Sequence, residues 1–106
     1  MVGPKYAVIY RWRIHPEKED QFVKAWSSVT LFYRQNHGAL GSRLHRGPDG
    51  IWYAYAQWPD AETRTRAFAQ AGEPEERAHL EDAIIERFPE IVLTPVADFL
   101  VLPSGA

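Results

Sequence analysis

The sequence predicts an α+β domain with the element order β-α-β-β-α-β, which is the ferredoxin-like arrangement. Alternating apolar side chains mark strands at both ends of the chain and in its middle, and apolar side chains spaced by three and four mark the helices between them. A third observation concerns residues 51–58, a run of apolar, aromatic and amide side chains without a charge. Such a run is typical of a strand in the centre of a sheet that is covered on both faces.

Length and composition predict one domain over residues 1–106, because no repeat or linker divides the chain. The formal net charge of −2 gives no basic surface for nucleic acid or for an anionic membrane. The absence of cysteine excludes disulfides, thiolate metal sites and cysteine nucleophiles. The first residues do not resemble a signal peptide and no apolar run approaches ~18 residues, so we expect a soluble, cytoplasmic protein.

The first strand covers residues 5–14, with one apolar, aromatic face and two arginines on the other face. Pro16 begins the first helix, and the acidic residues after it suit the positive end of the helix dipole. This helix runs to about residue 36, and Gly38 provides its left-handed stop. Its predicted buried stripe consists of Phe22, Trp26, Val29 and Tyr33.

A hairpin occupies the middle of the chain. Its strands are residues 40–46 and 51–58, and the glycine- and proline-containing turn at residues 47–50 joins them. The period of two in the second of these strands predicts one face made of Trp52, Ala54, Ala56 and Trp58.

Two helical segments and a strand complete the prediction. Asp60 caps a helix that extends to about residue 71. Pro74 starts a further helix to residue 88, and the last strand covers residues 91–102 with Pro95 at an edge or a bulge. The buried stripe of the second segment is predicted to be Leu80, Ile84 and Phe88.

The face of the sheet that the helices leave uncovered is too apolar to face water. Tyr53 and Tyr55 lie on it, and the last strand is apolar on both of its faces. A second copy of the chain is the simplest cover for such a face. We therefore predict a homodimer whose two sheets pack face to face, with no nucleic-acid or membrane partner.

Short motifs add a resemblance to a known family. Gly-Ala-Leu-Gly at residues 38–41 opens the second strand, Asp-Gly at residues 49–50 closes the turn, and Tyr-Ala-Gln-Trp follows at residues 55–58. With this element order, residues 6–102 resemble the antibiotic biosynthesis monooxygenase family. The resemblance implies a dimeric α/β barrel that binds a small aromatic ligand. It also implies a cofactor-independent monooxygenase that turns aromatic polyketide phenols into quinones, so no cofactor and no metal ion are expected.

The same resemblance nominates site residues. The pocket tryptophan of the family matches Trp58, whereas Ala54 stands where the family has an asparagine and Arg64 stands where it has a pocket tyrosine. We expect Trp58 to stack on the substrate, and Tyr10 with Arg64 or His79 to bind the substrate anion. The predicted catalytic residues are Trp58, Arg64 and His79, and the predicted substrate-binding residues are Tyr10, Trp12, Trp26, Ala54 and Tyr55.

Two other interpretations stay open. The same pocket fits a non-catalytic dimer that binds a small hydrophobic molecule, and each tryptophan also fits a core position. The haem-degrading branch of the family ligates iron through a helical histidine, for which His79 is the candidate. That branch also uses an asparagine in the first strand, which is missing here, and a tryptophan at a position that falls near Ala67.

Overall fold

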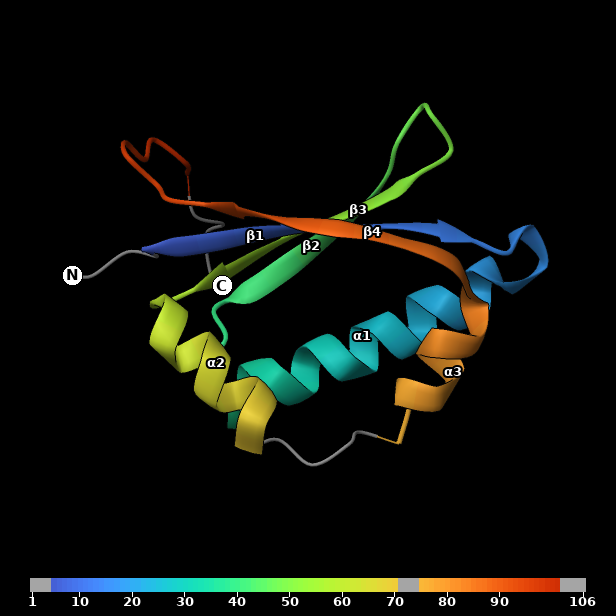
Figure 1. Ribbon diagram of the computed structural model, residues 1–106, viewed down its shortest axis with the longest axis horizontal. Coiled ribbons are helices and arrows are strands. Elements are labelled where there is room, and N and C mark those ends of the chain that lie inside the picture. Colours follow the sequence, from blue (N-terminus) through green and yellow to red (C-terminus); the bar gives the residue numbers. More distant parts are fainter. Residues whose placement is uncertain (1–4, 71–74, 102–106) are drawn as a thin grey trace.

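The computed structural model describes residues 5–70 and 75–101. Its elements are β1 (Tyr6–Ile14), a 3-10 helix η1 (Pro16–Lys18), α1 (Glu19–Asn36), β2 (Gly41–Arg46), β3 (Trp52–Trp58), α2 (Ala61–Gln70), α3 (Arg77–Ala83) and β4 (Ile84–Leu93). In this part of the chain the strands form one antiparallel sheet in the order β2-β3-β1-β4. Figure 1 shows the three α-helices beneath the same face of the sheet. The predicted ferredoxin-like α+β fold is confirmed.

The hydrophobic core lies between the sheet and α1. β3 buries every second residue, which confirms the predicted face made of Trp52, Ala54, Ala56 and Trp58. β1 contributes Val8 and Trp12, and α1 contributes Phe22, which is fully buried. This packing fixes which side of α1 faces the sheet. The positions of α1 next to the buried ones can then border a cavity.

α1 follows its predicted stripe only in part. Phe22 and Val29 are buried, whereas Trp26 and Tyr33 are half-buried and pack against the edge of the core. The helix ends as predicted near Gly38, whose φ of 80° is readily available to a residue without a side chain.

The C-terminal third differs from the prediction. α3 ends at Ala83 and β4 occupies Ile84–Leu93, whereas a helix to residue 88 and a strand over residues 91–102 were expected. The spacing of four between Ile84 and Phe88 fits a period of two as well as a helix, so it does not discriminate between them. β1 pairs with this segment from Ala7 to Ile14, which favours the strand. Residues 94–101 form no strand, and the predicted helix ends at residues 71 and 74 and the strand end at residue 102 lie outside the described residues.

Pro89 lies inside β4 at a β-bulge. The register shifts there, so that Pro89 and Glu90 together oppose Tyr10 of β1. β4 is an edge strand, in which a residue without an N–H is tolerated, and the Arg11 guanidinium donates to the Pro89 carbonyl oxygen at 2.7 Å. The irregularity expected at Pro95 therefore occurs earlier, and it brings Glu90 beside Tyr10.

The uncovered face of the sheet and the segment after β4 carry exposed apolar side chains. On β4, Ile91 and Leu93 are 40% and 37% exposed. Beyond it, Val96, Phe99 and Val101 are each more than 90% exposed. Within residues 5–70 and 75–101, no helix is both long enough and apolar enough to cross a membrane.

The β2–β3 turn depends on Gly47. A Cβ atom at this position would lie 2.6 Å from Tyr53 Cε1 and 2.9 Å from the Ile51 carbonyl oxygen. We therefore expect Gly47→Ala to lower the free energy of unfolding by about 1–3 kcal/mol, measured by urea denaturation. Gly50→Asn is the control, because Gly50 has a φ of 81° that asparagine tolerates and no atom within 4 Å of an added Cβ. Equal losses in the two variants would contradict this role of Gly47.

Candidate functional site

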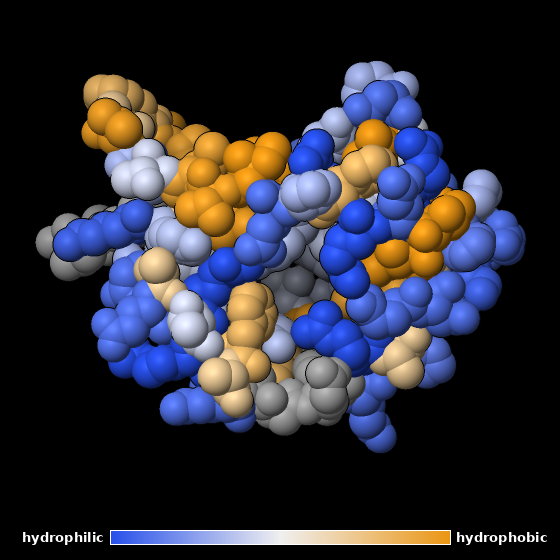
Figure 2. Space-filling model, in the orientation of Figure 1, coloured by the Kyte–Doolittle hydropathy of each residue, from blue (hydrophilic) through white to orange (hydrophobic). Residues whose placement is uncertain are grey.

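A cavity of about 820 Å³ lies between the sheet and the helices. Figure 2 shows a hollow beneath β4 and between α2 and α3, bordered by hydrophilic side chains. The volume falls within the range of small-molecule sites, roughly 300–1,000 Å³. Aromatic side chains along the cavity include Tyr10, Trp12, Trp26, Tyr33, Trp58 and Phe68.

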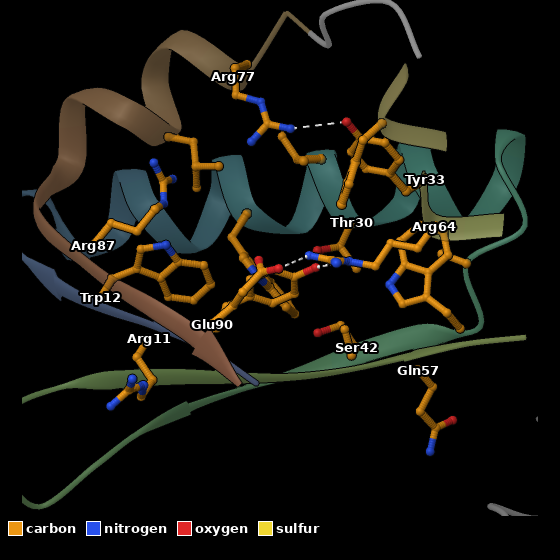
Figure 3. A pocket seen from close by; sticks show the side chains of 18 of the residues that line it. Arg11, Trp12, Thr30, Tyr33, Ser42, Gln57, Arg64, Arg77, Arg87 and Glu90 are labelled. Carbon is orange, nitrogen blue, oxygen red and sulfur yellow. Dashed lines mark hydrogen bonds and ion pairs between the residues drawn. The ribbon is translucent and has the colours of Figure 1, made fainter. Parts of the chain in front are cut away.

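Arg64 is the centre of a polar network in this cavity. Its Nε donates to the Tyr10 hydroxyl at 3.1 Å, and its Nη2 donates to Glu90 Oε1 at 2.7 Å. The guanidinium carbon also lies 5.0 Å from the ring centre of Phe68. Three elements therefore meet at one side chain: β1 supplies the hydroxyl, α2 the guanidinium and the bulge of β4 the carboxylate. Figure 3 shows these bonds across the middle of the cavity.

The protonation states in the network follow from burial and pairing. Burial raises the pKa of Tyr10, and the neighbouring Arg64 opposes this only in part, so the hydroxyl stays protonated at neutral pH. Burial also works against the charge of Arg64, but its hydrogen bonds to Glu90 and Tyr10 raise the pKa of the guanidinium overall. The site thus presents a neutral hydroxyl next to a permanent cation.

Trp58 forms an aromatic wall next to this network. It is 3% exposed and packs edge-on against Phe68 at 5.7 Å and Tyr33 at 6.4 Å between ring centres. Trp58 lies close enough to Tyr10 to lower its pKa, although its buried indole N–H does not reach hydrogen-bond geometry with any group in the described residues. Trp58 is therefore part of the core and also lines the cavity, and its indole N–H has no acceptor among the described residues.

The opposite end of the cavity holds a second charged cluster. Arg87 donates through both terminal nitrogens to the Glu81 carboxylate, at 2.9 and 2.8 Å. These hydrogen bonds lower the pKa of Glu81, and the charge of Arg77 acts in the same direction. Arg77 also donates to the Tyr33 hydroxyl at 3.2 Å, which links α3 to α1 over the cavity (Figure 3).

The structure brings five of the predicted site residues together. Trp58 and Arg64, from the predicted catalytic set, line the cavity. Tyr10, Trp12 and Trp26, from the predicted substrate-binding set, line it as well. Tyr10, Trp12 and Trp58 meet because strand alternation turns the tryptophan face of β3 and the even-numbered residues of β1 toward the helices, which supply Trp26 and Arg64.

Three predicted site residues lie elsewhere. Ala54 is fully buried in the core and does not line the cavity, because Tyr10 stands opposite it in the β1–β3 register. Tyr55 lies on the uncovered face of the sheet, because it alternates with the buried residues of β3. His79 is exposed and does not line the cavity, because the buried position of α3 belongs to Leu80.

The position of His79 also bears on the haem interpretation. Its backbone carbonyl accepts from Gln21 Nε2 at 2.8 Å, while its side chain stays outside the cavity lining. Among the described residues, no group of three or more histidine, cysteine, aspartate or glutamate side chains is placed to hold a metal ion. The cavity therefore provides no iron ligand at the histidine that the sequence nominates.

Several lining residues are not evident from the sequence. Glu90 reaches the site only through the bulge at Pro89, and Arg87 only because residues 84–93 form a strand. The signal for both is Pro89, which the sequence alone equally allows just after a helix that ends at residue 88. Arg77 and Glu81 were hidden for a different reason, since arginine and glutamate on a short helix look like a solvated face.

No family model matches the sequence, and no match is found among curated proteins. The fold does match solved structures. SnoaB, a cofactor-independent oxygenase from Streptomyces nogalater, aligns with a TM-score of 0.74 and 18% identity over 92% of this chain and 98% of its own. The chain has the fold of this oxygenase.

Two further structures extend the comparison. A candidate antibiotic biosynthesis monooxygenase from Caulobacter crescentus CB15 aligns with a TM-score of 0.71 and 14% identity over 91% of this chain and 93% of its own. Another from Bordetella bronchiseptica aligns with a TM-score of 0.69 and 17% identity over 90% of this chain and all of its own. These neighbours agree with the resemblance that the motifs at residues 38–58 indicate.

Proposed function

We propose that the protein is a cofactor-independent monooxygenase that acts on a small aromatic substrate with an ionisable hydroxyl group. The observation that carries this proposal is the cavity in which buried Trp58 lies beside the cation of Arg64 and the neutral hydroxyl of Tyr10. The fold shared with SnoaB supports the same class of reaction.

The chemistry of phenol oxidation explains how such a site can work without a cofactor. When a phenol becomes a quinone, one atom of O₂ becomes the new carbonyl oxygen. The other atom leaves as water with the hydrogens lost from the ring carbon and the hydroxyl. Because the substrate supplies all the electrons, the protein needs only to bind the ring, favour its anion and stabilise the charge that develops.

The residues of the cavity meet these requirements. Trp58 offers an aromatic surface for stacking, and the edge-on rings around it hold its orientation. Arg64 provides a cation for the substrate oxygen, and Glu90 holds that guanidinium in place. Tyr10 remains protonated and so donates a hydrogen bond rather than repelling an anion.

Oxygen consumption tests the proposal. With 1,5-dihydroxynaphthalene, metal-free and flavin-free protein should consume O₂ faster than the buffer blank and form the naphthoquinone in equal amount. An oxygen electrode and the visible absorption of the product measure the two quantities. Binding of the naphthol without oxygen uptake would contradict the oxygenase and favour the non-catalytic ligand-binding interpretation.

We also propose that two copies of the chain pair through the uncovered face of the sheet. The exposed side chains of Ile91 and Leu93, together with the apolar segment after β4, support this arrangement. Light scattering should therefore give twice the mass of the chain, and Ile91→Glu should shift the protein toward the monomer. Val23→Glu is the matched control, since Val23 is also 40% exposed but lies on α1. A monomeric wild-type protein would refute the dimer.

A further inference from the structure

The end of the cavity away from Arg64 contains a buried donor without an acceptor. Trp12 is 5% exposed, and its indole N–H has no hydrogen-bond partner in residues 5–70 and 75–101. Native proteins rarely leave a buried polar group unpaired, and one that lines a cavity is suited to an acceptor on a ligand. The oxygenase chemistry proposed above makes no use of this donor.

Arg87 stands next to the unpaired indole. The strand register pairs Trp12 of β1 with Arg87 of β4, which places the two side chains side by side on the helix-covered face. In Figure 3 the indole nitrogen lies on the edge of the ring that faces Arg87. An N–H donor and a guanidinium therefore converge at this end, which is an arrangement that suits an oxyanion.

The ion pair at this end leaves its arginine accessible to a ligand. Arg87 pairs with Glu81 through both terminal nitrogens at the mouth of the cavity. The Arg87 and Glu81 side chains are 51% and 42% exposed, and ion pairs at such exposure contribute little to stability. A ligand anion can thus share the guanidinium with Glu81 at small cost.

The geometry also matches the length of an aromatic acid. Tyr10 and Trp12 lie on the same face of β1, two residues apart, which corresponds to about 7 Å along a strand. Their rings are nearly parallel, with an interplanar angle of 12° and 6.1 Å between centres. A bicyclic ring that lies along these two side chains would place one end near Arg64 and the other near Arg87.

We propose that the end of the cavity formed by Trp12 and Arg87 binds a carboxylate of the ligand, so that the substrate is an aromatic carboxylic acid with its hydroxyl at Arg64. The proposal rests on the cavity being the substrate site of the proposed oxygenase. It adds the chemical class of the substrate and a role for Trp12 as a determinant of specificity.

A matched pair of probes tests the carboxylate subsite. The wild-type protein should bind 6-hydroxy-2-naphthoic acid at least tenfold more tightly than 6-hydroxy-2-naphthamide, which has the same shape without the charge. Titration calorimetry at neutral pH gives both dissociation constants. Arg87→Gln should remove most of this preference, and Trp12→Phe should reduce it while keeping the aromatic bulk.

Arg66→Gln provides the control, since Arg66 is exposed on α2, pairs with Glu62 and does not line the cavity. Its preference for the acid should equal that of the wild type. Equal affinity of the wild-type protein for acid and amide, or an unchanged preference in Arg87→Gln, would overturn the proposal. These outcomes do not depend on turnover. A clear acid preference without oxygen uptake would retain the subsite and refute the oxygenase, and oxygen uptake without acid preference would do the reverse.

Discussion

Arg64→Gln should reduce the rate of oxygen consumption with a naphthol substrate by about 10²- to 10³-fold, the effect of removing one preorganised group from a developing anion. The Arg64 side chain is 14% exposed, so water cannot readily replace it. Glutamine keeps a hydrogen-bond donor near Tyr10 but loses the charge that the proposed mechanism needs. The expected loss lies in kcat more than in KM, because the charge develops as the substrate reacts.

Two further variants separate charge from geometry at this site. Arg64→Lys keeps the charge but cannot bind Tyr10 and Glu90 with one planar fork, so we expect an intermediate rate. Arg66→Gln lies on the same helix outside the cavity and should retain the wild-type rate. Circular dichroism melting curves show whether each variant is folded. A folded Arg64→Gln protein with the wild-type rate would exclude Arg64 from the chemistry.

The strand register shows how the alanine at residue 54 shapes the cavity. Ala54 stands where the family that the sequence resembles has an asparagine, and its small side chain lies opposite Tyr10. The aromatic ring of Tyr10 can therefore lie over β3, where a larger side chain would compete for the space. The polar network around Arg64 thus draws its groups from β1, α2 and β4.

The elements that can be predicted from the sequence are those in which the spacing of apolar residues and the residues at the element ends indicate the same structure. β1 and β3 alternate over seven or more residues, and α1 has an acidic start and a glycine stop, so their positions were predicted to within a few residues. Residues 84–93 failed this test, because a spacing of four fits both helix and strand. Pairing with β1 decides in favour of the strand, and this contact between distant parts of the chain cannot be seen in the local sequence.

The same distinction applies to the site. Strand alternation places Tyr10, Trp12 and Trp58 on the helix-covered face of the sheet, so these residues of the predicted site line the cavity. Glu90 was missed because a bulge breaks that alternation at one point, and a single sequence does not show which proline produces it. His79 immediately precedes buried Leu80 on α3, so its side chain faces solvent instead of the cavity.

Phe22→Ala should be the most destabilising of the substitutions considered, with a loss of about 3–5 kcal/mol in the free energy of unfolding. Phe22 is fully buried, and its ring packs edge-on against Trp12 and Trp52, with 5.2 Å and 5.7 Å between ring centres. Since a domain of this size has a total stability of roughly 5–15 kcal/mol, the variant is expected to be partly unfolded at moderate temperature. Urea denaturation gives the difference. Leu31→Ala, on an exposed position of α1, should cost less than about 1 kcal/mol.

Phe22 also connects the core to the proposed carboxylate subsite, because it supports the ring of Trp12 from behind. Phe22→Leu keeps most of the buried volume and should leave the protein folded, while the indole loses one of its edge contacts. We expect this variant to bind the hydroxynaphthoic acid more weakly and to show a smaller preference for acid over amide. The same affinities as in the wild type would mean that the neighbouring Tyr10 ring is enough to hold Trp12 in place.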